Sequence, residues 1–195
     1  ETSGILLFAR NQVAAARLQK QREEGKLQKK YLALAEGDLS EANDSVFWKE
    51  IAIPLAPDPE NPMKMTISPD GLLPGSRNAV TYYKNIKSFG NVTLVELQLE
   101  TGRTHQIRVH MSGIGHPLLG DTMYNPRVCL KMSNSKEKKN TEGRINNRND
   151  CFKRAALHAW KLTFCHPFTD EIITLEAPLP DDFCRFLNAN EEEKT

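Results

Sequence analysis

The residues with the clearest chemical potential lie in the stretch Thr101–His110, whose sequence is TGRTHQIRVH. Two arginines and two histidines fall within it, together with a glutamine. Such a group of donors, two of them permanently charged, is suited to binding a carboxylate or a phosphate. For any one of these side chains alone, a solvated basic turn is the simpler interpretation. That interpretation is much weaker for the whole stretch in this order.

Elements on either side must position this stretch. The upstream segment Asn91–Glu100 shows the loose alternation of a strand, carried by Val92, Leu94, Leu97 and Leu99. The chain then turns and is expected to enter a short helix, on which His105 and Arg108 share a face because they are three residues apart. Asn78–Ile86, rich in β-branched and aromatic residues, is predicted to pair with the upstream strand as a hairpin.

The run Gly102–His110 closely resembles the signature of the RluA-type pseudouridine synthases, enzymes that convert uridine in RNA to its C-glycoside isomer. The resemblance continues through His116–Asp121 to Tyr124. Other family motifs are similar to segments spread over nearly the whole chain: Lys29–Leu34 with Gly37, Lys64–Ile67, Ala79–Tyr83, Arg154–Ala159 and Leu162–Pro167. The implied fold is α+β, a mixed and mostly antiparallel sheet with helices and loops flanking a central cleft.

A single catalytic domain over residues 1–190 is expected, because 195 residues suffice for one sizeable core. The hydrophobic pattern fails in the basic stretch 125–150, which is interpreted as an insertion. It is either a solvated loop or an additional contact with an RNA backbone. Residues 191–195 form an acidic tail.

Asn11 is a predicted N-cap for a helix over Gln12–Glu23, which Gly25 ends. This helix is interpreted as a packing element, with Arg22 facing outward and Val13, Ala16 and Leu18 facing the core. Further strands are expected at 1–10, 26–37 and 47–53, a long proline-rich loop at 54–74, and a short helix at 181–187. The segment 172–175 also belongs to the family resemblance.

The opening residues Glu1–Arg10 resemble the second half of a family motif whose first half carries the catalytic aspartate. By this resemblance the nucleophile falls ahead of residue 1, and the chain as given is expected to lack it and to be inactive alone. Either the sequence is a portion of a longer protein, or it is a fragment that does not react. The first interpretation is favoured.

The resemblance also implies roles for residues that are present. Arg108 would pair with the nucleophile, since a nearby guanidinium keeps a buried carboxylate ionised. Tyr31, which its strand context alone predicts to be a half-buried packing residue, would stack on the target base and move the proton from C5. The candidates for contact with RNA are Lys29, Arg103, His105 and Gln106.

Asp121 is the aspartate that invites assignment as a replacement nucleophile, but its family position looks structural. The remaining histidines are expected to be scaffold residues: His110, His116, His158 and His166.

The composition argues against some classes of function but does not identify one. The 26 Lys and Arg residues nearly balance 25 Asp and Glu, so no global basic field indicates nucleic acid. Four scattered cysteines without a Cys-x-x-Cys pair argue against zinc and for reduced thiols in an intracellular compartment, which is left unassigned. No apolar run approaches the roughly 18 residues of a membrane span. The expected protein is a monomer that acts on transfer, ribosomal or messenger RNA and needs neither metal nor cofactor.

Two other classes of function stay open. One is an RNA-binding or RNA-folding module that kept the cleft and lost the chemistry. The other is an unrelated nucleic-acid hydrolase, which would need metal-binding carboxylates or a histidine pair at workable spacing. Neither pattern is found in the sequence.

Overall fold

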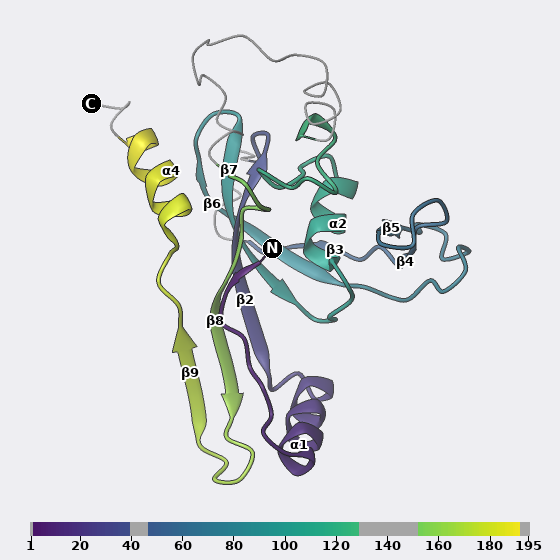
Figure 1. The fold of residues 1–195 in the computed structure, drawn as a ribbon, viewed down its shortest axis with the longest axis vertical. Coiled ribbons are helices and arrows are strands. Elements are labelled where there is room, and N and C mark those ends of the chain that lie inside the picture. Colours follow the sequence, from purple (N-terminus) through teal and green to yellow (C-terminus); the bar gives the residue numbers. More distant parts are fainter. Residues whose placement is uncertain (1, 40–46, 129–151, 192–195) are drawn as a thin grey trace.

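The computed structural model describes residues 2–39, 47–128 and 152–191 (Figure 1). Its main sheet is built from β1 (Ser3–Gly4), β2 (Gln28–Glu36), β3 (Lys49–Ile51), β6 (Thr81–Ser88), β7 (Val92–Leu99), β8 (Leu157–Cys165) and β9 (Ile172–Glu176). The strand order is β1-β8-β2-β7-β6-β3, with β9 also paired to β8. Only β1 and β8 run parallel among these pairs. The mixed, mostly antiparallel sheet predicted from the sequence is therefore confirmed.

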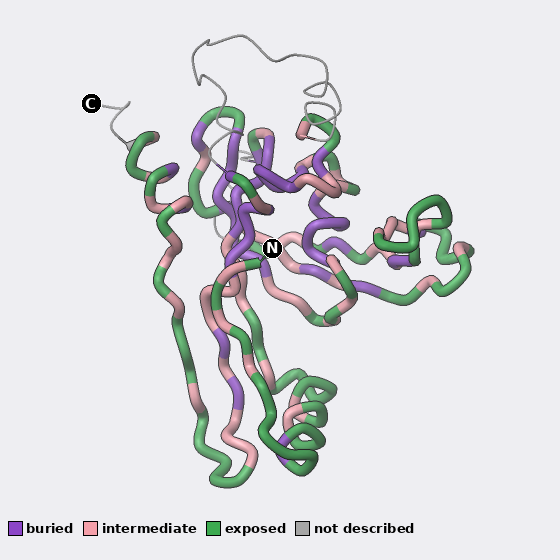
Figure 2. Tube along the Cα trace, viewed as in Figure 1, coloured by how far each residue is buried: buried purple, intermediate pink, exposed green. Residues whose placement is uncertain are grey.

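Three complete helices are described beside the sheet: α1 (Gln12–Glu23), α2 (Gln106–Gly113) and α4 (Asp181–Glu191). Residues 126–128 are also helical. The predicted cap of α1 is confirmed, because the Asn11 side chain accepts a hydrogen bond of 2.8 Å from the Ala14 backbone N–H. The core face predicted for α1 is wrong. Val13 and Ala16 are exposed and Ala14 is the buried residue of the helix. A largely polar helix has too narrow an apolar stripe to be buried, and α1 lies at the edge of the molecule (Figure 2).

Two other predictions about the chain's first half need correction. The opening strand is confined to β1, and Leu6 and Phe8 beyond it are exposed. The loop expected at 54–74 contains a separate two-stranded sheet made of β4 (Leu55–Pro57) and β5 (Met65–Ile67). Each strand has three residues, so neither shows the alternation that identifies a strand from its sequence.

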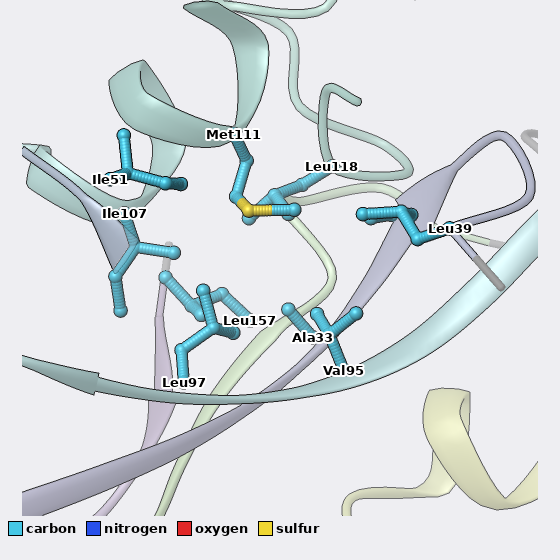
Figure 3. Close-up of a cluster of buried hydrophobic side chains, with 10 residues drawn as sticks. Ala33, Leu39, Ile51, Val95, Leu97, Ile107, Met111, Leu118 and Leu157 are labelled. Atoms are coloured by element: carbon cyan, nitrogen blue, oxygen red, sulfur yellow. The ribbon is translucent and has the colours of Figure 1, made fainter. Parts of the chain in front are cut away.

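The two faces of the main sheet are covered by different helices. Ala33, Val95 and Leu97 pack against Ile107 and Met111 of α2, as Figure 3 shows. The alternate strand residues pack against α4 in a second cluster, which contains Leu34, Val92, Leu94, Phe183 and Phe186. Because neighbouring residues of a strand point to opposite faces, β2 and β7 contribute to both cores.

Several sequence predictions fall outside the described residues. They are Glu1, most of the basic insertion, Cys129, Cys151 and the end of the acidic tail. Within the part of the chain that is described, no helix is long and apolar enough to span a membrane.

Candidate active site

A cleft of about 430 Å³ lies where the start of β2, the end of β7 and the turn into α2 meet the last turn of α1. Its wall includes Tyr31 and Lys29 of β2, Tyr82 of β6 and Arg103 of the turn, as well as Arg22 of α1. Three of these residues are cationic, and Glu100 is the acidic residue of the lining. The cleft is thus suited to an anionic ligand that also presents a flat apolar surface.

Tyr31 is half-buried in the cleft wall, where it packs against the core cluster under α2. The register between β2 and β8 shifts beside it: Lys30 pairs with Lys161 and Tyr31 with Ala159. A bulge of this kind bends a strand and redirects a side chain. Burial raises the pKa of the Tyr31 hydroxyl, while the positive charge of Arg22 acts in the opposite direction.

The second tyrosine of the cleft has a different environment. The Tyr82 hydroxyl donates a hydrogen bond of 2.7 Å to the Glu100 carboxylate. This bond raises the pKa of Tyr82 to about 12, because loss of the proton would leave two negative groups in contact. The Tyr82 hydroxyl is therefore held by Glu100 and retains its proton near neutral pH.

Arg108 is 5 % exposed and lies on α2 beneath the turn. Its Nε and Nη2 donate to the two carboxylate oxygens of Asp121, each at 2.7 Å. Asp121 is fully buried and also accepts hydrogen bonds from the backbone N–H groups of Met123 and Tyr124. Burial alone would raise the pKa of Asp121, but these bonds, with that of Arg108 first, hold it below its ordinary value. The sequence did not indicate this partner for Arg108.

His105 precedes α2 with a positive φ of 55°, a conformation that a residue with a Cβ rarely adopts. Its Nδ1 lies 2.8 Å from the hydroxyl oxygen of Tyr124. That oxygen also accepts a hydrogen bond of 2.9 Å from the Met65 backbone N–H. The Tyr124 ring in turn lies 5.0 Å from the guanidinium carbon of Arg108. Tyr124 thus fixes both predicted residues, His105 and Arg108.

Gln106 was predicted to contact RNA, and its side chain is buried beneath the turn. Its amide oxygen accepts hydrogen bonds from the Thr101 hydroxyl and the Arg103 backbone N–H, at 2.8 and 2.9 Å. Its amide nitrogen donates to Val80 O and Thr81 Oγ1, at 2.9 and 3.0 Å. These four bonds occupy the amide within the protein, so Gln106 holds the turn in shape rather than facing the cleft.

Arg22 is a cleft residue that sequence reasoning missed, as are Tyr82 and Glu100. The Arg22 Nη2 donates a hydrogen bond of 3.1 Å to Gly102 O, at the beginning of the turn. Helical periodicity placed this side chain outward, which is correct for α1 alone. The available signal was its position in the last turn of a helix that leads through Gly25 directly into the strand of Lys29 and Tyr31.

Histidines expected to be scaffold residues have protein partners in the structure. His110 is buried and lies 2.8 Å from both Thr81 Oγ1 and Ile53 O, and burial lowers its pKa. His116 and His158 contact Glu36 O and Ser3 Oγ. Among the described residues, no three His, Cys, Asp or Glu side chains are arranged to hold a metal ion.

The face of the sheet opposite α2 carries a charged cluster made of Lys30, Lys84, Glu96 and Trp48. Glu96 is 6 % exposed and binds Lys30 and Lys84 at 2.9 and 2.8 Å. Both ammonium groups lie over the Trp48 ring, at 5.7 and 5.0 Å from its centroid. Lys30 is the chain neighbour of Tyr31, so this cluster fixes the far face of the strand that carries the cleft tyrosine.

Comparison with known proteins connects this geometry to one family. Residues 1–113 match the family model described as RNA pseudouridylate synthase. The chain is 37% identical over 187 residues to the uncharacterized RNA pseudouridine synthase YlyB of Bacillus subtilis, covering 96% of this chain and 52% of that protein. It is 36% identical over 189 residues to ribosomal large subunit pseudouridine synthase D of Haemophilus influenzae, covering 97% and 53%. The chain thus spans about half the length of these relatives.

Two solved human structures show similar folds. RNA pseudouridylate synthase domain containing 1 superimposes with a TM-score of 0.62 at 27% identity, covering 88% of this chain and 62% of that one. RNA pseudouridylate synthase domain containing 4 gives a TM-score of 0.67 at 24% identity, covering 93% and 69%, and supports the fold alone.

Proposed function

The chain belongs to the RNA pseudouridylate synthase family, of the RluA type, and we propose that it forms most of the catalytic domain of an enzyme that isomerises uridine to pseudouridine in structured RNA. The observation that carries this proposal is the cleft. It places Tyr31 among three cationic side chains directly beside the turn that leads to Arg108. The proposed reaction uses no metal and no cofactor.

The isomerisation requires few chemical groups. The N1–C1′ bond of the uridine breaks, the base rotates, and a C5–C1′ bond forms. The proton at C5 then leaves and N1 gains a proton, so no atom is lost overall. A carboxylate is needed to bond covalently to the nucleoside or to stabilise an oxocarbenium-like sugar. A base is needed for the C5 proton. The target base must also leave the RNA stack to reach either group.

We assign the base-stacking and proton-accepting role to Tyr31. Its ring lies in the cleft wall, whereas the hydroxyl of the other cleft tyrosine, Tyr82, is already bonded to the Glu100 carboxylate. Lys29 and Arg103 would bind the phosphates of the flipped nucleotide's strand. The Arg103 Nε donates a hydrogen bond of 3.0 Å to Asn78 O, and this bond orients the side chain. His105, held by Tyr124, would contact the RNA at the entrance to α2.

The nucleophile in this proposal is an aspartate ahead of residue 1. The register of β1 supports this location. Ser3 and Gly4 run parallel to His158 and Ala159, so the chain just ahead of them is directed toward Leu157. Leu157 packs in the same cluster as Ile107, the chain neighbour of Arg108, and Tyr31 packs against that cluster. An aspartate delivered here would be close to both proposed partners.

Asp121 would prepare Arg108 for that nucleophile. Asp121 accepts hydrogen bonds from two donors of the Arg108 guanidinium. The orientation of the guanidinium is therefore fixed before the reaction begins. A guanidinium held in this way can lower the pKa of a second carboxylate beside it and keep that carboxylate ionised. Lysine at position 108 would keep the charge but could not make the paired bonds.

The test is tritium release from RNA labelled at uridine C5, with the protein that carries its native sequence ahead of residue 1 and with a chelator present. We expect release by this protein, and loss of release when the upstream aspartate is replaced by asparagine. Release that stops on chelation would favour a metal-dependent reaction. RNA binding without release, on pooled cellular RNA, would favour the non-catalytic RNA-binding module instead.

A further inference from the structure

The packing of α1 does not account for the orientation of the Arg22 side chain. Arg22 lies in the last turn of α1, which has Ala14 as its buried residue and is largely exposed. From there its guanidinium reaches across the cleft to Gly102 O, 80 residues away in the chain. A structural tether would not require an arginine at this point, because α1 is already joined to β8. The Gln21 amide exchanges two hydrogen bonds of 2.8 Å with the Cys165 backbone.

The turn is shaped to receive this side chain. A Cβ built on Gly102 would lie 2.4 Å from Arg22 Nη2, well inside contact distance. The glycine of the turn therefore leaves the space that the guanidinium fills. One Arg22 N–H bond goes to Gly102 O, and among the described residues no carboxylate lies within ion-pair distance of Arg22. The other donors of its planar fork are thus available to a ligand in the cleft.

The charges that line the cleft also favour an anionic ligand. Arg22 and Arg103 line the cleft from different elements, and Lys29 lies there as well. The opposing carboxylate, Glu100, already accepts a hydrogen bond from Tyr82. Partial enclosure lowers the pKa of Lys29, and the neighbouring charge of Arg22 lowers it further. Like charges held together in this way are most stable when an anion lies between them.

We propose that Arg22 and Arg103 form a two-sided clamp for an RNA phosphate at the cleft that contains Tyr31. The clamp rests on the proposed function, because it assigns Arg22 to the binding of the same substrate. Arg22 acts in binding and not in the chemical step. Its loss therefore weakens affinity and raises KM, while kcat on saturating RNA changes little.

The experiment uses the protein with its native upstream sequence and a labelled pool of transfer and ribosomal RNA. Affinity is measured at several salt concentrations for Arg22→Gln and Arg22→Lys. The matched control is Lys20→Gln, which removes one positive charge from the same helix outside the cleft, where Lys20 faces Glu24. Arg22→Gln should bind roughly three- to tenfold more weakly, and the slope of log affinity against log salt should fall by about 0.7 to 1. Arg22→Lys should keep most of the slope, and Lys20→Gln should match wild type.

Each contrary outcome has a defined meaning. Equal slopes for wild type and Arg22→Gln would overturn the clamp, and so would an equal loss in Lys20→Gln, which would indicate a general field. A fall in kcat with unchanged affinity would also overturn it, because Arg22 would then act on the chemistry. If wild type releases no tritium from C5-labelled RNA, the proposed function fails, and the binding series still decides whether Arg22 holds RNA.

Discussion

Arg108 and Asp121 form a bidentate ion pair that is almost completely removed from solvent, with both N···O distances at 2.7 Å. A buried pair of this kind is costly to break, because the remaining charge has lost its hydration without compensation. Met123 and Tyr124 donate their backbone N–H groups to the same carboxylate. Asp121 thus joins α2 to the segment that follows it.

Replacing Asp121 with asparagine should lower the free energy of unfolding by about 3–5 kcal/mol, because the guanidinium then faces an amide in a dry site. Urea denaturation measures this. Glu176→Gln is the matched control, since its ion pair with Lys161 is solvent-exposed and should cost less than about 1 kcal/mol. Equal losses in the two variants would contradict the assignment of Asp121 as the anchor of Arg108.

The same pair predicts a pH dependence of stability. The pKa of Asp121 in the folded state lies below its ordinary value of 3.8. Its stabilising contribution is therefore fully present above that ordinary value and is lost as the pH falls through the folded-state pKa. The stability difference between wild type and Asp121→Asn should be constant near neutral pH and should shrink below about pH 4. A difference that grew on acidification would mean the opposite sign of shift.

Tyr31→Phe should lower kcat by roughly 10²–10⁴, because it removes the proposed proton acceptor and keeps the stacking ring. RNA affinity should change by less than about threefold, since the aromatic surface is retained. Tyr83→Phe is a suitable control, because Tyr83 packs against the same hydrophobic cluster and does not line the cleft. Arg108→Lys should show the same pattern of lost turnover with binding largely kept. A parallel loss of binding would contradict both roles.

The left-handed backbone of His105 allows a separate test. Asparagine tolerates positive φ better than most residues, and valine is strongly disfavoured there. His105→Val should therefore be less stable than His105→Asn by about 1–2 kcal/mol, although both lose the contact with Tyr124. Thermal or urea unfolding of the two variants measures the difference. Equal stabilities would mean that the turn relaxes to an ordinary conformation.

Gly102→Ala should weaken RNA binding through Arg22. The new Cβ would meet the end of the Arg22 side chain, which can move away without a change in the backbone. Affinity should fall to about the level of Arg22→Gln, and the double variant should be no weaker than Arg22→Gln alone. A double-mutant cycle on RNA affinity measures this coupling. Additive losses would indicate that Gly102 acts on the RNA independently.

The elements that were predicted well are those specified by local chemistry. Asn11 and Gly25 bracket α1 because capping is decided within a few residues. The β6–β7 hairpin follows from β-branched and aromatic runs separated by a short turn. The family motifs added the sheet and the cleft, and they singled out Tyr31 and Arg103, which do line that cleft.

What the sequence did not reveal depends on contacts between distant segments. Asp121 reaches Arg108 only because the turn after Leu119 folds back on α2. Arg22 and Gly102 are 80 residues apart in the chain, so the helical pattern of α1 does not predict their contact. A glutamine is often a ligand-binding residue, but the Gln106 amide is bonded to Val80 and Thr81, at and just ahead of the start of β6. The sequence predicted that Val13 faces the core, but its side chain is exposed.

The lysines that lie over Trp48 make this residue a suitable fluorescence probe of β2. Trp48 lies on the sheet face opposite α2, next to Lys30, and Lys30 directly precedes Tyr31. Indole emission depends on nearby charges, so small shifts of β2 on ligand binding are expected to change it. The chain has two tryptophans, and the buried Nε1 of Trp160 has no hydrogen-bond partner among the described residues. Trp160→Phe would therefore leave Trp48 as the single native tryptophan, beside the strand that carries Tyr31.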